Sequence, residues 1–329
     1  MGESVVNKKK LTGAMVNCLA VITLLLPACC FAKEGAVTAE SRGKTQREAQ
    51  LGRFDIPEEL YKQGLHYAQY GFFDEAIEMY KKALARNPSY PDVYNKLGVA
   101  YSQKGLYDLA IESFQKAIEQ KPRDAEIYYN LGSAYFDRGS FDNAITAFQK
   151  TIQMNPEYQS AYSLLGIAYT KVGKYDEAIQ ILKKRVEFDP GLAIAHSNLG
   201  IVYSMKGMAA EALTAYNKAL EIDPGHETAL YNIGLLYDKE GNTDKAIQYY
   251  NRTVEINVSN ADAQCRLGKN YMKNKQYDEA IDAFQTAVMS NPDNIEIYND
   301  LGNAYKAKGM EKEAEGYFSL YKKKSKKVK

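Results

Sequence analysis

Apolar and small residues recur along the chain with a period of 34 residues, from Pro57 almost to the C-terminus. In the stretch 125–158, AEIYYNLGSAYFDRGSFDNAITAFQKTIQMNPEY, the recurring residues stand at positions 4, 7, 8 and 11 of the unit and again at positions 20, 24 and 27. Each set follows the spacing of one face of a helix. Glycine at position 15 and proline at position 32 punctuate the pattern. Each unit is therefore predicted to be a helix (A), a short turn and a second helix (B).

The unit is repeated without insertion or deletion. Gly stands at position 8, Tyr at position 11 and Ala at position 20 of every copy. The eight copies are 57–90, 91–124, 125–158, 159–192, 193–226, 227–260, 261–294 and 295–324. A hairpin this small cannot bury both of its apolar stripes alone, so neighbouring copies must stack into a solenoid. Glycine in a helix costs roughly 0.5–1 kcal/mol relative to alanine, so the glycine at position 8 indicates a close helix–helix approach. We expect this glycine to face the alanine at position 20.

This pattern resembles the tetratricopeptide (TPR) repeat, W-x2-L-G-x2-Y…A-x3-F…P. The resemblance implies an all-α fold, a right-handed superhelical TPR solenoid of helix-turn-helix repeats. The chain departs from the pattern at a few positions. Position 4 is never Trp, Val258 replaces proline at position 32, and Lys275 replaces glycine at position 15. These departures predict a weak joint around copies 6 and 7.

The first 32 residues differ from the rest. Three lysines, 8–10, precede the uncharged segment LTGAMVNCLAVITLLLPACCFA, which ends in small residues. This is the pattern of an export signal, and its length would also allow an uncleaved membrane anchor. Leu26-Pro27-Ala28-Cys29 resembles the lipobox of bacterial lipoproteins, which makes Cys29 a candidate lipidation site. Cleavage after Ala32 by ordinary signal peptidase and an uncleaved anchor are the alternatives. We expect the repeats to lie outside the cytoplasm, at the cell envelope or periplasm and tethered to the membrane, with a secreted form as a further outcome.

Two flanking segments complete the domain organisation. Residues 33–56 are polar and mixed in charge, as in a flexible linker. The last copy passes into a lysine-rich tail that ends at 325–329. A solubilising tail is the simpler interpretation of these lysines, and contact with an acidic surface is the alternative.

The composition and motifs of the chain point to no catalytic or metal-binding site. The net charge of +1 gives no reason to expect a nucleic-acid partner. His66, His196 and His226 have no Cys or His at metal-ligand spacing, and Cys265 is the only cysteine in the repeats. Phosphate-binding and nucleophile motifs are absent from the sequence. We therefore expect neither an enzyme nor a cofactor or metal site.

The remaining functional feature is the groove face. The TPR resemblance implies that A-helix positions 2, 5, 6, 9, 12 and 13 line the concave groove. A row of asparagines can bind an extended peptide backbone in either direction, because an amide both donates and accepts hydrogen bonds. The candidate groove residues are Asn95, Asn130, Asn198, Asn232, Asn299, Tyr61, Tyr129, Tyr231, Phe136, Ile167, Ile201 and Leu235. Helix-surface polarity and inter-repeat hydrogen bonding are the simpler interpretations of each asparagine. The row resembles the asparagine-lined TPR arm of the O-linked N-acetylglucosamine transferases, whereas the lysine clamp of chaperone-binding TPRs is not matched.

These features favour a non-enzymatic scaffold that binds a protein or an extended peptide in the groove at the cell envelope. Two alternatives remain at this stage. One is an assembly or pilot factor for a secretion, pilus or polysaccharide-export machine. The other is the adaptor arm of a separately encoded enzyme.

Overall fold

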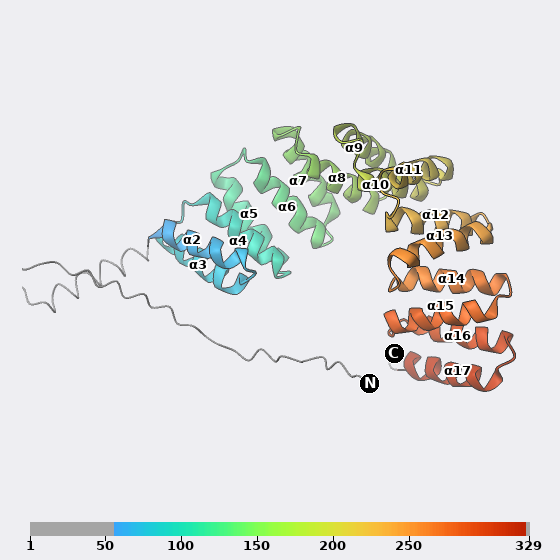
Figure 1. Ribbon diagram of the computed structural model, residues 1–329. Coiled ribbons are helices and arrows are strands. Elements are labelled where there is room, and N and C mark those ends of the chain that lie inside the picture. The colour runs from blue at the N-terminus through green and yellow to red at the C-terminus, as the bar shows by residue number, and fades with distance from the viewer. Residues whose placement is uncertain (1–55, 327–329) are drawn as a thin grey trace, which may run out of the picture. The chain divides into compact units, whose positions relative to one another are not determined.

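The computed structural model describes residues 56–326, and within them every regular element is an α-helix. The sixteen described helices form eight consecutive hairpins (Figure 1). The A helices are α2 (Pro57–Gln69), α4 (Pro91–Gln103), α6 (Ala125–Asp137), α8 (Gln159–Lys171), α10 (Ala193–Met205), α12 (Glu227–Lys239), α14 (Ala261–Lys273) and α16 (Ile295–Ala307). The B helices are α3 (Phe73–Arg86), α5 (Tyr107–Gln120), α7 (Phe141–Met154), α9 (Tyr175–Phe188), α11 (Ala209–Ile222), α13 (Thr243–Ile256), α15 (Tyr277–Ser290) and α17 (Glu311–Ser325).

Each helix packs mainly against the helices before and after it in the chain. Most A helices also touch the A helix of the next unit, and α12 and α14 approach each other least closely. The structure is therefore a solenoid, in which stability is approximately a sum of unit and neighbour terms. The signal segment, Cys29 and the linker before Ile56 lie outside the described residues.

The glycine at position 8 makes room for the residue at position 24, whose side chain would lie nearest to a Cβ at that glycine. A Cβ on Gly132 would lie 2.7 Å from the ring of Phe148. The corresponding distance is 2.4 Å between Gly64 and Tyr80. The alanine at position 20 is also buried in every unit, but its atoms are not among the nearest neighbours of that glycine. The glycine thus lets a whole ring of helix B lie against the backbone of helix A.

Two kinds of hydrogen bond join successive units. Position 4 binds the carbonyl of position 32 in the preceding unit, as in the contact of His196 Nε2 with the Pro190 oxygen at 2.9 Å. Tyr162, Gln264 and Tyr298 do the same. Position 4 is leucine at Leu60 and Leu230, which have no side-chain donor, so this hydrogen bond joins only some of the units. The tyrosine at position 11 is held from position 25 of the preceding unit, as where Gln149 Nε2 donates to Tyr169 Oη at 2.7 Å.

The turn between helices A and B requires a left-handed backbone. Glycine provides it in seven units, with φ between 71° and 86°, and Lys275 adopts φ 61° in the seventh unit. A residue with a side chain pays roughly 1–2 kcal/mol in this conformation.

We therefore expect Lys275→Gly to raise the free energy of unfolding by about 0.5–1 kcal/mol, since glycine populates φ > 0 freely but loses more backbone entropy on folding. Urea denaturation of the two proteins measures the change. Glu240→Gly is the matched control, because Glu240 is the exposed C-cap residue of α12, stands one position earlier in its unit than Lys275 does, and has φ −76°. Loss of stability in both glycine variants would contradict the prediction.

Candidate functional site

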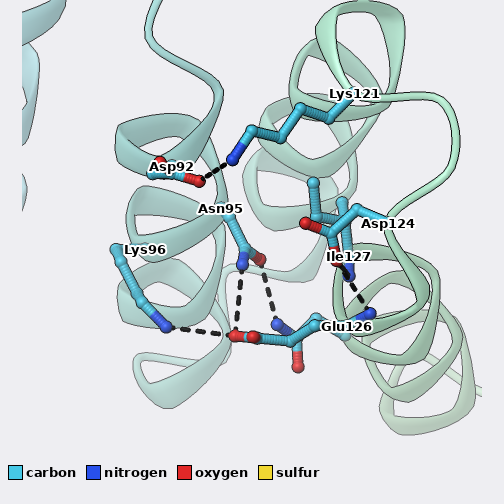
Figure 2. A network of polar contacts seen from close by, with 8 residues as sticks. Asp92, Asn95, Lys96, Lys121, Asp124, Glu126 and Ile127 are labelled. Carbon is cyan, nitrogen blue, oxygen red and sulfur yellow. Dashed lines mark hydrogen bonds and ion pairs between the residues drawn. The ribbon is translucent and has the colours of Figure 1, made fainter.

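The asparagines of the N-terminal units belong to a polar network between α4 and α6. Asn95 is buried, and its Nδ2 donates to Glu126 Oε1 at 3.3 Å. Asn130 Nδ2 donates to Asn95 Oδ1 at 2.9 Å, and Lys96 Nζ lies 3.1 Å from Glu126 Oε1. Figure 2 shows these side chains converging from the two helices, next to the pair Lys121–Asp92. In these units the asparagine amides form hydrogen bonds between repeats, so fewer of their donors and acceptors remain for a bound peptide.

The remaining asparagines differ from one another. Asn232 Nδ2 donates to the Thr228 carbonyl of its own helix at 2.7 Å. Asn198 and Asn299 are partly buried and have no hydrogen-bond partner among the described residues. Position 6 therefore does not present a uniform ladder, and Asn198 is the position-6 amide whose donors and acceptor are all unused within residues 56–326.

The groove-face aromatic residues pack partly into the core. Tyr61, Tyr129 and Tyr231 each lie against the position-24 ring of their own unit, with centroid separations of 6.1, 5.9 and 5.9 Å. Burial raises the pKa of Tyr61 and of Tyr231. Phe136 meets Phe141 edge to face at 5.3 Å. These rings extend the core to the groove face, and the part of each ring that stays exposed can contact a ligand.

A cavity opens between the A helices of units 4 and 5. It has a volume of about 310 Å³ and is lined by Ile167, Thr170, Lys171, Leu182, Asn198, Ile201, Val202 and Met205. Most of these residues come from positions 6, 9, 12 and 13, the positions assigned to the groove. Leu182 distinguishes unit 4, because position 24 is an aromatic residue in every other unit, and position 5 of the same unit is Ser163, where units 1, 3 and 6 have tyrosine. Ile167, Ile201 and Asn198, three of the candidates from the sequence, are thus brought together at one cavity.

The lining residues Lys171, Thr170, Val202 and Met205 were missed by the sequence reasoning. Lys171 and Met205 occupy position 13, which belongs to the groove set, so the register alone could have identified them. Met205 is 52% exposed, so much of its side chain is open to a ligand at the cavity. The cavity offers apolar contact together with one amide, which suits one side chain and the adjoining backbone of a peptide.

Leu235 follows in the next unit, where it is half-buried and packs against the core cluster around Tyr250. Beyond it the groove face becomes charged. Asp238 accepts from Lys273 Nζ at 2.6 Å and lies 3.6 Å from Arg266 Nη1. Lys269 pairs with Asp300 at 3.1 Å. These pairs link successive A helices of units 6 to 8.

The described residues contain no cluster of His, Cys, Asp and Glu able to hold a metal ion. His66 lies edge-on to Tyr70, and His226 Nδ1 lies 3.6 Å from Asp223 Oδ2. Burial raises the pKa of the Cys265 thiol, which lowers the fraction of the reactive thiolate at neutral pH. Among helices α2–α17, none combines the length and the apolar character that a membrane span requires.

Family models support the repeat assignment over most of the chain. Models described as tetratricopeptide repeat match residues 61–125, 125–158, 160–225 and 191–257, and a model described as TPR repeat matches 268–309. The chain belongs to the tetratricopeptide repeat family. TPR proteins are typically non-enzymatic scaffolds that bind proteins or peptides.

Solved structures show the same fold. A tetratricopeptide repeat protein from Parabacteroides merdae is 21% identical, with a TM-score of 0.63 over 75% of this chain and 98% of that one. The C-terminal part of a TPR repeat-containing protein from Cytophaga hutchinsonii is 19% identical, with a TM-score of 0.57 over 73% of this chain and 99% of that one. MamA protein is 36% identical over 51% of this chain and 92% of its own, with a TM-score of 0.49. Among curated proteins, none matches the chain significantly.

Proposed function

We propose that this TPR protein is a non-enzymatic scaffold that binds an extended segment of a partner protein on its groove face. The observation that carries the proposal is the cavity between α8 and α10, where Ile167, Ile201 and the unpartnered amide of Asn198 meet. An extended peptide needs both kinds of contact, amides for its backbone and apolar pockets for its alternate side chains.

Affinity capture with the full chain, followed by mass spectrometry, identifies the partner. Binding measurements with variants then show which face of the solenoid the partner contacts. One soluble client supports the scaffold. Capture of a membrane-bound secretion, pilus or polysaccharide-export machine would move the protein to the assembly-factor class, and capture of a separately encoded enzyme would make it an adaptor.

Asn198→Ala is expected to weaken the affinity for the captured partner by about 0.5–1.5 kcal/mol, roughly two- to thirteenfold, through the loss of one or more hydrogen bonds. Isothermal titration calorimetry measures it. The control is Asn217→Ala, which removes the same side chain from an exposed position of the B helix of the same unit. An equal loss in both variants would place binding away from the groove face. Gln149 is unsuitable as a control on helix B, because it holds Tyr169 of the next unit.

We further propose that the scaffold works at the cell envelope, outside the cytoplasm. The basis is the uncharged segment 11–32 behind three lysines. We expect the mature protein to begin at Cys29 with a lipid on that cysteine, so that Cys29→Ser releases it from the membrane fraction. Intact-mass spectrometry and fractionation measure both. A mature mass that begins at Lys33 would indicate ordinary cleavage after Ala32, and an intact cytosolic chain that begins at Met1 would refute the location.

A further inference from the structure

The charge on the groove face changes along the solenoid. In units 2 and 3 and in units 6 to 8 the groove positions include carboxylates, and several of these pair with basic residues, as in Lys96–Glu126 and Arg266–Asp238. Units 4 and 5 differ. Of the groove positions of these two units, 2, 5, 6, 9, 12 and 13 in each, only Lys171 is charged, and none carries a carboxylate.

Lys171 lines the cavity between α8 and α10 and has no ion-pair or hydrogen-bond partner among the described residues. Lys171 is exposed and is the last residue of α8. An ammonium group at the rim of an otherwise neutral and apolar cavity attracts an anionic ligand group more strongly than one in a balanced ion-pair network does.

A second cation lies deeper in the same unit. Arg185, on α9 at position 27 of unit 4, is 8% exposed, and its Nε and Nη1 are buried without a hydrogen-bond partner. The same position carries Ala or Thr in the other units except the last, where it is Tyr321. Leu182, which lines the cavity, precedes Arg185 by three residues and therefore lies on the same face of α9. An unpaired buried guanidinium destabilises the fold, so an arginine at an alanine position indicates a use outside folding.

We infer that the cavity of units 4 and 5 binds an apolar side chain of the partner segment, and that Lys171 binds a carboxylate two residues away from that side chain. Alternate residues of an extended chain point to the same side and lie roughly 7 Å apart, so both groups can face α8 and α10. Arg185 adds positive potential behind the cavity. This inference rests on the proposed function and goes further by stating the chemistry of the ligand, an extended segment of the form apolar–any–acidic.

The probe is a library of random twelve-residue peptides displayed on phage and selected on the immobilised full chain. We expect the selected peptides to carry Leu, Ile, Met or Phe with Asp or Glu two residues away. For a selected peptide made synthetically, Asp→Asn is expected to reduce the affinity about tenfold, as for the loss of one partly exposed charge pair. Lys171→Glu should reduce the affinity for the Asp form at least as much and should remove the difference between the two peptides.

Two variants distinguish a specific contact between Lys171 and the peptide carboxylate from a general effect of net charge. Lys174→Glu makes the same charge change at an exposed residue three positions on, at the turn before α9, and should leave the affinity unchanged. Arg185→Ala restores the residue that the repeat prefers, and should raise thermal stability while it weakens the acidic peptide.

The possible failures are distinguishable. If selected peptides lose affinity with Asn198→Ala but bind equally as the Asp and Asn forms, the inferred acidic specificity is wrong and the groove function stands. If the selected peptides are insensitive to Asn198→Ala as well as to Lys171→Glu, both the specificity and the groove function are overturned.

Discussion

Phe148→Ala is expected to lower the free energy of unfolding of the central repeats by about 3–5 kcal/mol, the usual cost of removing a buried phenylalanine ring. Phe148 is 0% exposed and packs on α6, against the backbone at Gly132 and the ring of Tyr129. Helix α6 cannot collapse into the space without losing its contacts with α8, so most of the cavity would remain.

Native-state hydrogen exchange measures this change unit by unit. Because each unit contacts only its neighbours, we expect loss of protection in α4–α9 and little change in α15–α17. Phe72→Ala is the control, since Phe72 is 55% exposed, and a change within about 0.5 kcal/mol is expected there. A uniform loss of protection from α2 to α17 would contradict the neighbour-only description of the solenoid.

Most of the fold follows from the periodicity. In all but the last unit the A helix spans positions 1–13 and the B helix positions 17–30, and the glycine at position 15 has positive φ wherever it occurs. Helical spacing and turn residues determine these boundaries locally, so they can be predicted without tertiary information.

The partner of the position-8 glycine could not be predicted in this way. Spacing within one helix shows which residues share a face, but it does not give the axial offset between two packed helices. That offset places the Phe148 ring nearest to a Cβ at Gly132. The size of the residue at position 24 is a signal that could have suggested it, because a ring needs more room than a methyl group.

The groove illustrates the same limit. Register correctly groups Asn130, Asn198 and Asn232 at position 6, but their hydrogen bonds depend on the neighbouring helices. Asn130 finds Asn95 on the preceding A helix, Asn232 binds its own backbone, and Asn198 finds neither. The rotamer of each side chain depends on its particular neighbours, and the repeat pattern does not specify these neighbours. Arg185, in contrast, was visible in the sequence as the single arginine at a small-residue position.

The close packing of the Phe148 ring on Gly132 can be tested by adding a methyl group at Gly132. Gly132→Ala is expected to lower the free energy of unfolding by up to about 2 kcal/mol, because overpacking costs roughly 1–3 kcal/mol and the higher helix propensity of alanine offsets about 1 kcal/mol of it. The new Cβ would lie 2.7 Å from Cδ1 and Cε1 of the fully buried Phe148 ring, which has no free space to move into.

Gly316→Ala is the matched control. Gly316 lies within α17, and a Cβ there would meet nothing within 4 Å, so alanine should raise stability by about 0.5–1 kcal/mol. The steric origin is then tested by a double-mutant cycle. In the Phe148→Ala background the ring is absent, so Gly132→Ala should change from destabilising to neutral or stabilising. If the cost of Gly132→Ala is the same with and without the ring, its cause lies elsewhere than in the contact between helices A and B.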